Sequence, residues 1–281
     1  MNVKDAIQFV KSSIESSNAE IDSEVDARYL LSFILNKDFT WLKTWPEKML
    51  DDADIEKLTR LTERRKKGEP IAYITGTKDF WSLTLKTNPS TLIPRPETEL
   101  LVESALAFLE NKKIAKILDL GTGTGAIGLA IASEKPNSNI VASDFQKGAV
   151  DLAKENAQLN NIDNIDILLS DWFSNITTRE FDLIVSNPPY VEADDPHLKR
   201  GDLVFEPDTA LVALDNGLSD IKIIVAQSKQ FLLDGGALMI EHGFEQGKKV
   251  RELYVKQGFR EVKTIKDLSG LDRITVGISL C

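Results

Sequence analysis

Apolar side chains in the first 68 residues recur at intervals of three and four, the spacing that places them on one face of an α-helix. The pattern is clearest at Val3, Ala6, Ile7, Val10 and Ile14 and again at Ile55, Leu58 and Leu61. No glycine precedes Gly68. We therefore predict a small helical N-terminal domain over residues 1–70.

The spacing of apolar residues becomes shorter after Gly76. Trp81, Leu83 and Leu85 alternate with Ser82, Thr84 and Lys86, as expected for β-strands with one buried face. We expect residues 71–94 to form a β-hairpin linker. The next stretch, residues 89–110, is punctuated by prolines and becomes helical in pattern from Glu97, so that a second domain is predicted over residues 95–281.

The second domain alternates apolar strands with amphipathic helices. Strands are expected at residues 114–120, 139–144, 165–170, 181–186, 236–242 and 273–280, with helices beginning near Ala126 and Gly148 and another at 245–258. Repeated strand–helix units predict an α/β fold with a mainly parallel sheet and helices on both faces. A ligand would bind beyond the carboxyl ends of the strands, near the point where the strand order reverses.

Composition narrows the class of protein. The chain has 281 residues, of which 42% are hydrophobic and 28% charged, enough for two globular domains. It shows neither an N-terminal signal pattern nor an uncharged run of the ~18 residues that a membrane span needs, so we expect a cytoplasmic protein without a membrane partner. Cys281 is the only cysteine and there are two histidines, which argues against a disulfide framework and a structural metal site.

The formal net charge of −10 argues against a DNA-binding protein, because such proteins usually carry a basic face. One basic run exists, from Arg64 to Lys67, and it is followed by Gly68 and Pro70. Cations in a last helical turn followed by glycine are typical of a helix C-terminus. We favour that interpretation, with a contact to RNA or to a protein partner as the alternative.

A glycine-rich loop separates the first expected strand of the second domain from its helix. Gly121, Gly123 and Gly125 lack a Cβ, so the backbone can turn tightly and a ligand can approach it closely. A nucleotide-like cofactor is the expected occupant. Read from Gly123, the residues also satisfy the G-x-G-x-x-G pattern of NAD enzymes through Gly128. The glycines alone therefore do not distinguish an NAD site from a site for another nucleotide-like cofactor.

Two further side chains suit such a cofactor. Asp144 ends the second strand, where a carboxylate can accept hydrogen bonds from ribose hydroxyls, although it could instead cap the following helix. Asp171 and Trp172 follow the third strand, and a carboxylate beside a flat ring suits an adenine. A core position is the alternative for Trp172.

The fourth strand ends in Asn187-Pro188-Pro189-Tyr190. The prolines lack N–H groups, so this wall would offer acceptors, namely the Asn187 side-chain oxygen and the Pro188 carbonyl. Such a wall can hold an –NH2 group while positive charge develops on its nitrogen, and Tyr190 could lie flat on the planar group. A nitrogen nucleophile beside an adenosine pocket favours methyl transfer from S-adenosylmethionine over hydride transfer. A rigid strand-ending turn is the alternative.

Together these features resemble the class I methyltransferases, and the Asn-Pro-Pro-Tyr turn resembles that of enzymes methylating amino groups of adenine, cytosine or glutamine. Further stretches are similar to the peptide chain release factor N5-glutamine methyltransferases, the PrmC or HemK family: "TLIPRPETE" at 91–99, "FEP" at 205–207, "EHGFEQG" at 241–247 and "KDLSGLDR" at 266–273. The resemblance covers nearly the full length.

The resemblance implies a Rossmann-like methyltransferase sheet with an antiparallel C-terminal edge over residues 95–281. It also implies methyl transfer from S-adenosylmethionine to the glutamine side-chain amide in the Gly-Gly-Gln motif of bacterial-type class I release factors. Residues 1–70 would dock on the release factor, and we expect a monomer. The alternatives are a DNA base N-methyltransferase, an NAD-dependent oxidoreductase and a non-catalytic protein that binds release factors.

Site residues are carried over from the family as follows. The cofactor would contact Gly121, Thr122, Gly123, Thr124, Gly125, Asp144, Trp172 and Asn187, and Arg95, Pro96 and Glu97 would line its pocket from the other side. The substrate amide would lie on Asn187, Pro188, Pro189 and Tyr190, with Asn187, Pro188 and Tyr190 as the catalytic residues. Asp208 departs from the pattern, which more often has an arginine there, so its role stays open.

Overall fold

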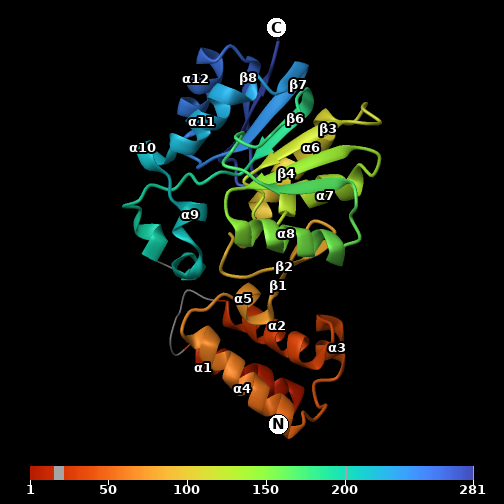
Figure 1. The fold of residues 1–281 in the computed structure, drawn as a ribbon. Coiled ribbons are helices and arrows are strands. Elements are labelled where there is room, and N and C mark those ends of the chain that lie inside the picture. The colour runs from red at the N-terminus through yellow and green to blue at the C-terminus, as the bar shows by residue number, and fades with distance from the viewer. Residues whose placement is uncertain (16–21, 200, 281) are drawn as a thin grey trace. The chain divides into compact units, whose positions relative to one another are not determined.

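The computed structural model describes residues 1–15, 22–199 and 201–280 (Figure 1). The chain divides into two compact units. The helical unit comprises Met1–Thr77 together with Pro196–Phe205, and the sheet unit comprises Lys78–Asp195 together with the chain from Glu206 onward. The three domains expected at 1–70, 71–94 and 95–281 stay a prediction.

The described residues of the helical unit form five α-helices and two 3-10 turns: α1 (Val3–Glu15), α2 (Ser23–Leu35), α3 (Phe39–Thr44), α4 (Asp52–Lys66), α5 (Ile71–Thr75), η2 (Pro196–Lys199) and η3 (Gly201–Phe205). The residues that define the helical period, such as Val10, Ile14 and Leu58, are fully buried in one apolar cluster. The predicted helical N-terminal region is therefore confirmed.

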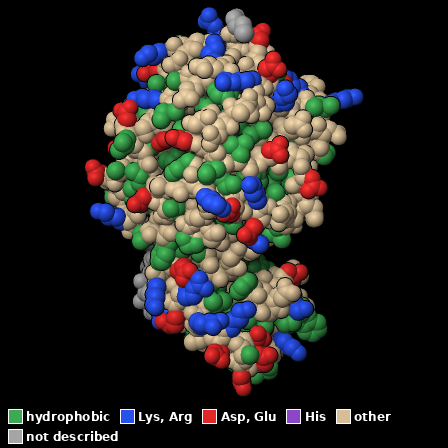
Figure 2. Space-filling model, in the orientation of Figure 1, with side chains coloured by type: hydrophobic (Ala, Val, Ile, Leu, Met, Phe, Trp, Pro, Cys, Tyr) green, Lys and Arg blue, Asp and Glu red, His purple; other side chains and the backbone are tan. Residues whose placement is uncertain are grey.

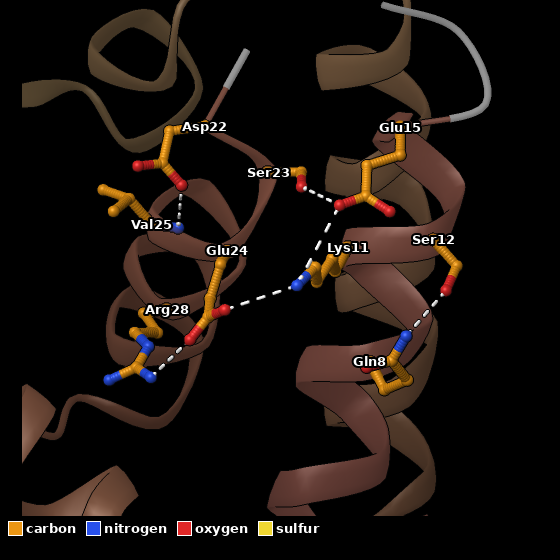
Figure 3. Close-up of polar contacts among 9 residues, drawn as sticks. All are labelled: Gln8, Lys11, Ser12, Glu15, Asp22, Ser23, Glu24, Val25 and Arg28. Atoms are coloured by element: carbon orange, nitrogen blue, oxygen red, sulfur yellow. Dashed lines mark hydrogen bonds and ion pairs between the residues drawn. The ribbon is translucent and has the colours of Figure 1, made fainter. Parts of the chain in front are cut away.

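Polar contacts join α1 to α2 on the outside of this cluster (Figure 3). Lys11 pairs with Glu24 at 3.4 Å, and Ser23 donates a hydrogen bond to Glu15 at 2.9 Å. Glu24 also accepts from Arg28 at 2.7 Å. Because these charges are exposed to solvent, the pairs add little stability, and the apolar cluster supplies most of it.

The basic run lies in the last turn of α4, so the helix-end interpretation is confirmed. One of its members is buried: Arg65 binds Asp26 at 2.6 Å and the Glu69 carbonyl at 3.0 Å. Arg65 also reaches Asp202 of η3 at 3.2 Å, while the aromatic ring of Phe205 packs against Gly68. The segment 196–205 is thus tied into the helical unit by an ion pair and a ring contact.

The sheet unit holds a hairpin and a larger sheet. The hairpin pairs β1 (Thr77–Phe80) with β2 (Leu83–Lys86). The seven-stranded sheet has the order β5-β4-β3-β6-β7-β9-β8, with bounds β3 (Lys116–Leu120), β4 (Asn139–Asp144), β5 (Ile165–Leu169), β6 (Phe181–Ser186), β7 (Leu232–Glu241), β8 (Arg260–Lys266) and β9 (Asp272–Ile278). The pairs from β5 to β7 are parallel, and β9 pairs antiparallel with β7 and β8. The predicted α/β fold and its antiparallel C-terminal edge are confirmed.

Helices cover both faces of this sheet (Figure 1). On one face lie α6 (Glu99–Phe108), α7 (Ala126–Glu134) and α8 (Lys147–Leu159), and on the other α11 (Ser219–Ser228) and α12 (Gly247–Lys256). Successive strand side chains alternate between the two cores: Leu183 and Val185 of β6 join the first, and Ile184 joins the second. The short elements η1 (Pro96–Thr98), α9 (Asp208–Leu211) and α10 (Leu214–Gly217) flank the carboxyl edge. No helix of the described residues is long and apolar enough to cross a membrane.

Two local features differ from the sequence-based expectation. Ile71–Thr75, expected in the hairpin linker, is helical and follows Pro70, whose fixed φ suits a helix start. Trp81 is not a strand residue but forms the turn between β1 and β2, with a positive φ of 57°. Its ring nitrogen donates to Glu134 of α7 at 2.8 Å, which fastens the hairpin to the rest of the sheet unit.

Candidate active site

A cavity of about 440 Å³ opens at the carboxyl ends of β3, β4 and β6. This is the edge of the sheet where β4 and β6 flank β3 on opposite sides, the switch point at which open α/β sheets bind ligands. Its volume lies in the range typical of small-molecule sites. The predicted site residues that line it are Gly121, Thr122, Gly123, Thr124, Asp144, Trp172, Asn187 and Pro189.

The glycine loop needs its glycines for two reasons. Gly121, Gly123 and Gly125 have φ values of 70°, 56° and 87°, a region that side chains with a Cβ rarely adopt. A Cβ on Gly125 would also lie 2.7 Å from Leu129, and one on Gly121 would lie 3.4 Å from the Trp172 ring. Gly125 itself does not line the cavity, so its contribution is to turn the chain into α7.

Asp144 joins the end of β4 to the glycine loop. Its Oδ2 accepts from the Gly123 N–H at 3.0 Å, and its Oδ1 accepts from the Gln146 N–H at 2.9 Å. Burial raises the pKa of Asp144 above its ordinary value, and the backbone hydrogen bonds oppose that rise. Each oxygen keeps a second lone pair, so the carboxylate can still accept ribose hydroxyls.

Asp119, which the sequence analysis did not single out, holds the glycine loop by hydrogen bonds. It is fully buried, and its Oδ2 accepts from the Thr122 hydroxyl at 2.6 Å and from the Gly128 N–H at 3.0 Å. Burial raises its pKa to about 6. Gly128 is therefore a packing residue: a Cβ there would lie 2.9 Å from the Asp119 carboxylate. The available signal was the carboxylate just ahead of the first glycine in "LDLGTG".

Trp172 reaches the cavity through an unusual backbone conformation. Its φ is 45°, and the Ser170 hydroxyl donates to its carbonyl oxygen at 2.8 Å. The same Ser170 oxygen accepts from the Asn175 N–H at 3.0 Å. The tight turn after β5 thus brings Ser170, Asp171 and Trp172 to the cavity wall.

Asn187 is half-buried at the end of β6, and its amide has a defined partner. Its Nδ2 donates to the Thr98 hydroxyl at 3.2 Å. The amide oxygen Oδ1 is therefore the group left to face the cavity that Asn187 lines. Ser186, the residue before it, donates to the Leu120 carbonyl at 2.8 Å and fixes the strand end against β3.

The rest of the Asn-Pro-Pro-Tyr turn is divided between cavity and interior. Pro189 lines the cavity, whereas Pro188 is buried and, like Tyr190, does not line it. The Tyr190 hydroxyl donates to Oε1 of Glu241 at 3.4 Å, and burial raises the pKa of this phenol well above its ordinary value. Tyr190 is therefore a neutral group in this site and not a base.

The backbone of Tyr190 is held by two further contacts. Its carbonyl accepts from the Gln246 amide at 3.0 Å. Gly217 lies so close that a Cβ there would come within 2.1 Å of the same carbonyl oxygen. Neither Gln246 nor Gly217 was singled out individually by the sequence, although "EHGFEQG" contains the former.

The opposite wall contains Arg95 and Thr98, whereas Pro96 and Glu97 do not line the cavity. Glu206, fully buried at its side chain, binds Arg95 at 2.5 Å and accepts from the Ile93 N–H at 3.1 Å. The predicted "FEP" motif thus fixes the "TLIPRPETE" segment. Asp208 is exposed at the first residue of α9, and nothing in the structure assigns it a contact with the cavity.

Comparison with known proteins extends over both units. Residues 5–76 match the PrmC N-terminal domain, and residues 96–209 match the methyltransferase small domain. The chain is 52% identical to the release factor glutamine methyltransferase of Aliivibrio fischeri, covering 95% of each chain. The chain belongs to the release factor glutamine methyltransferase family. The member from Escherichia coli is 47% identical over 96% of this chain and 97% of its own.

Membership of this family confirms the resemblance found in the motifs. It also shows that the glycine pattern belongs to a methyltransferase and not to an NAD-dependent oxidoreductase. Solved structures agree on the fold. A methyltransferase from Pyrococcus furiosus superposes with a TM-score of 0.53 at 18% identity, covering 79% of this chain and 100% of that one. A T. thermophilus 16S rRNA methyltransferase gives 0.53 at 19% identity, covering 72% and 49%.

Proposed function

We propose that this protein transfers a methyl group from S-adenosylmethionine to the side-chain amide nitrogen of the glutamine in the Gly-Gly-Gln motif of peptide chain release factors. The observation that carries the proposal is the Asn187–Thr98 hydrogen bond of 3.2 Å. It occupies the donor end of the Asn187 amide and leaves the acceptor end for the cavity. The Oδ1 acceptor can receive a hydrogen bond from an incoming –NH2 group, whereas a donor in its place would repel that group.

The cavity residues fit the adenosyl cofactor. Glycine backbone at 121 and 123 lets a ligand approach closely, and the Asp144 carboxylate offers free lone pairs to ribose hydroxyls. The Trp172 ring provides a flat surface for a base. S-adenosylmethionine supplies a methyl group made electrophilic by a sulfonium. The residues of this chain hold that donor and orient the acceptor nitrogen.

The catalytic work is positioning and charge complementarity. Oδ1 of Asn187 and the Pro188 carbonyl would accept the two amide hydrogens of the substrate, which turns the nitrogen toward the methyl group. The same two oxygens stabilise the positive charge that develops on this nitrogen as it is alkylated. Tyr190 stays neutral and contributes its ring. The sulfur keeps the electron pair of the broken S–CH3 bond and leaves as a neutral thioether, and the methylated nitrogen loses its extra proton to solvent. No strongly basic side chain is therefore required.

We further propose that residues 1–70 dock on the release factor. On α2, Val25, Tyr29 and Phe33 are 41%, 46% and 40% exposed and lie on the face opposite the buried Leu30 and Leu31. The stripe continues into α3, because the Tyr29 ring meets the Phe39 ring edge-on at 4.9 Å. A contiguous apolar stripe of this kind is typical of a protein-binding surface.

The charge distribution favours a protein over a nucleic acid as the macromolecular substrate. Figure 2 shows acidic and basic side chains mixed over the visible face of both units, and the net charge is −10. A phosphate backbone would favour a continuous basic surface. A substrate that belongs to the translation machinery would make the enzyme cytoplasmic. A monomer would be sufficient for activity, because the cavity and the docking stripe both belong to a single chain.

A label-transfer experiment tests the proposal. The full-length protein is incubated with methyl-labelled S-adenosylmethionine and, in parallel, with a release factor, with the same factor carrying Asn in place of the Gly-Gly-Gln glutamine, and with duplex DNA. We expect label in the unmodified factor alone, and mass spectrometry should place one methyl group on that glutamine. Label in the glutamine-lacking factor or in DNA would refute the proposed substrate.

A further inference from the structure

One glutamine side chain joins three separate backbone segments at the carboxyl edge of the sheet. Gln246 directly precedes α12, and its Nε2 donates to the Tyr190 carbonyl at 3.0 Å and to the Asn216 carbonyl at 3.1 Å. Its Oε1 accepts from the Gly243 N–H at 2.9 Å. These three bonds tie the end of the Asn-Pro-Pro-Tyr turn to the loop after β7 and to the short helix α10.

The partners leave the Gln246 amide only one orientation. Both Nε2 hydrogens meet carbonyl oxygens, which can only accept, and Oε1 meets a backbone N–H, which can only donate. Rotation by half a turn would set an oxygen against two carbonyls and an –NH2 group against an N–H. A carboxylate of the same shape has no hydrogen to donate, so a glutamate could not form the two bonds to the carbonyls.

The segment that meets Gln246 has an unusual backbone. Asp215, Asn216 and Gly217 have successive φ values of 59°, 55° and 72°, a left-handed conformation that is disfavoured in residues with a Cβ. The turn directs the Asn216 carbonyl to Gln246. It also packs Gly217 so closely that a Cβ there would lie 2.1 Å from the Tyr190 carbonyl oxygen. Backbone of this kind persists only where surrounding contacts hold it, and it is often found at functional sites.

The same segment belongs to a stretch, residues 208–217, that forms part of the cavity wall. Val191, the residue after the Asn-Pro-Pro-Tyr turn, forms a parallel bridge with Val212 through two backbone hydrogen bonds of 2.9 Å. The turn and the stretch 208–217 are therefore one hydrogen-bonded unit, and Gln246 is bonded to both parts of it. Three residues of the stretch line the cavity: Thr209, Ala210 and Val212.

The turn needs anchors at its two ends because its middle cannot form them. The two prolines lack N–H groups, and although their φ angles are fixed, rotation about ψ is not. At the first end, the Asn187 amide donates to Thr98. At the second end, Gln246 holds the Tyr190 carbonyl. Loss of the second anchor would let the turn rotate about its ψ angles and displace the acceptor groups proposed to receive the substrate.

We propose that Gln246 is a positioning residue for methyl transfer, which acts through the Tyr190 backbone to hold the Asn-Pro-Pro-Tyr turn and the wall at 208–217 in the arrangement that receives the substrate amide. This inference rests on the proposed function of the site. It deepens that function by naming a residue that does not line the cavity and yet sets the geometry of its acceptor groups.

A role in capping α12 makes the opposite prediction for one substitution. Gln246 occupies the N-cap position of α12, although its side chain forms no capping hydrogen bond. A negative charge is favourable at this end of a helix, so Gln246→Glu would be neutral or stabilising if capping were the role. If the amide is needed for its two donors, the same substitution is harmful, because a carboxylate would face the carbonyls of Tyr190 and Asn216.

The test compares variants of the full-length enzyme in single-turnover methylation of a release factor with saturating S-adenosylmethionine. At a pH of about 8 we expect Gln246→Ala to lower the methylation rate by roughly 10-fold and Gln246→Glu by roughly 100-fold, as small misplacements of reacting groups do. Gln257→Glu is the matched control, since it makes the same change of charge at an exposed position directly after α12. It should keep the wild-type rate.

Two readouts separate positioning from a general loss of structure. Calorimetric affinity for S-adenosylmethionine should change by less than about 2-fold in all three variants, because Gln246 does not line the cavity. The rate of Gln246→Glu relative to wild type should rise as the pH is lowered from about 8 to about 6, since a protonated carboxyl regains one hydrogen to donate.

Hydrogen exchange measured by mass spectrometry reports the anchoring of the turn without relying on the reaction. Peptides covering residues 187–195 and 208–217 should exchange faster in Gln246→Ala by roughly 10-fold, whereas peptides of β4 should not change. A wild-type rate in Gln246→Glu at a pH of about 8, equal losses of rate and cofactor affinity, or unchanged exchange would each overturn the inference. If exchange responds as expected but the wild-type enzyme labels no release factor, the proposed function fails instead.

Discussion

The backbone N–H of Gly123 donates to Oδ2 of Asp144 at 3.0 Å, so the carboxylate at the end of β4 also holds the loop at the end of β3. Two features of the proposed cofactor site, the glycine loop and the Asp144 carboxylate, are therefore one structural unit. A change at Asp144 should alter the shape of the loop as well as the contact with the ribose.

Asp144→Asn should weaken binding of S-adenosylmethionine by roughly 10- to 100-fold, because hydrogen bonds to a charged group are each worth about 1.5–3 kcal/mol. The asparagine amide would also place a donor against a backbone donor. Isothermal titration calorimetry measures the loss. Asp151→Asn is the control, since Asp151 is exposed on α8 and pairs with Lys147. Equal affinities for both variants would contradict the role of Asp144.

Asn187→Ala should lower the single-turnover methylation rate by roughly 100-fold or more, the effect of removing one preorganised transition-state hydrogen bond. Affinity for S-adenosylmethionine should fall less. Asn111→Ala is a matched control because Asn111 is exposed ahead of β3, at the sheet edge opposite the cavity. A near-normal rate for Asn187→Ala would mean that this side chain is not a catalytic acceptor.

Asp119→Asn should change how stability depends on pH. The pKa of Asp119 is raised from 3.8 to about 6 on folding, so the folded state favours the protonated form. Its contribution is most favourable below pH 4 and is lost as the pH rises through about 6, which costs on the order of 3 kcal/mol at neutral pH. The stability of the variant relative to wild type should therefore increase from pH 4.5 to 6.5 in urea unfolding. A difference independent of pH would show that Asp119 titrates normally.

Arg65→Ala should destabilise the helical unit by about 3 kcal/mol, the low end for breaking a buried ion pair, because the Asp26 carboxylate, whose side chain is 13% exposed, loses its cation but keeps some contact with water. Hydrogen exchange measured by mass spectrometry on peptides from α2 and α4 of the full-length protein reports this local opening. The control is Arg60→Ala, an exposed position on the same helix, which should change stability by less than about 0.5 kcal/mol. Unchanged exchange in Arg65→Ala would refute a structural role for the ion pair.

Tyr29→Ala and Phe33→Ala should weaken the use of an intact release factor by roughly 10-fold each if the stripe on α2 is the docking surface. The rate with a short peptide containing Gly-Gly-Gln should stay the same, because such a peptide lacks the parts of the release factor that would contact this surface. Val255→Ala, at an exposed apolar position on α12, serves as the control. Equal losses with factor and peptide would indicate a folding defect and not a lost contact.

Most of the fold was predictable because the buried strands are short apolar runs bounded by turn residues. β4 and β6 were expected at 139–144 and 181–186, and the structure gives the same bounds. β8 was missed. Its sequence, Arg260–Lys266, lies at the sheet edge with most side chains at least partly exposed, so it carries little hydrophobic pattern.

Site residues were predictable only where they directly follow a strand in the sequence. Parallel strands end at one edge of the sheet. That edge holds the glycine loop after β3, Asp144 at the end of β4 and Asn187 after β6. Thr98 and Glu241 escaped notice as site residues because their partners are 89 and 51 positions away, at Asn187 and Tyr190. No local pattern encodes such a pairing, and it becomes visible only after the strands are ordered.

The membership of residues 196–205 in the helical unit has a practical consequence. The backbone passes between the two units after Thr77, after Asp195 and before Glu206, so the units are interlaced along the chain and not arranged in series. Cutting the gene after residue 77 would remove Arg65 and Gly68 and leave Asp202 and Phe205 without their partners. The sheet unit is therefore not a detachable module, and chimeras that exchange the helical unit must carry the 196–205 segment with it.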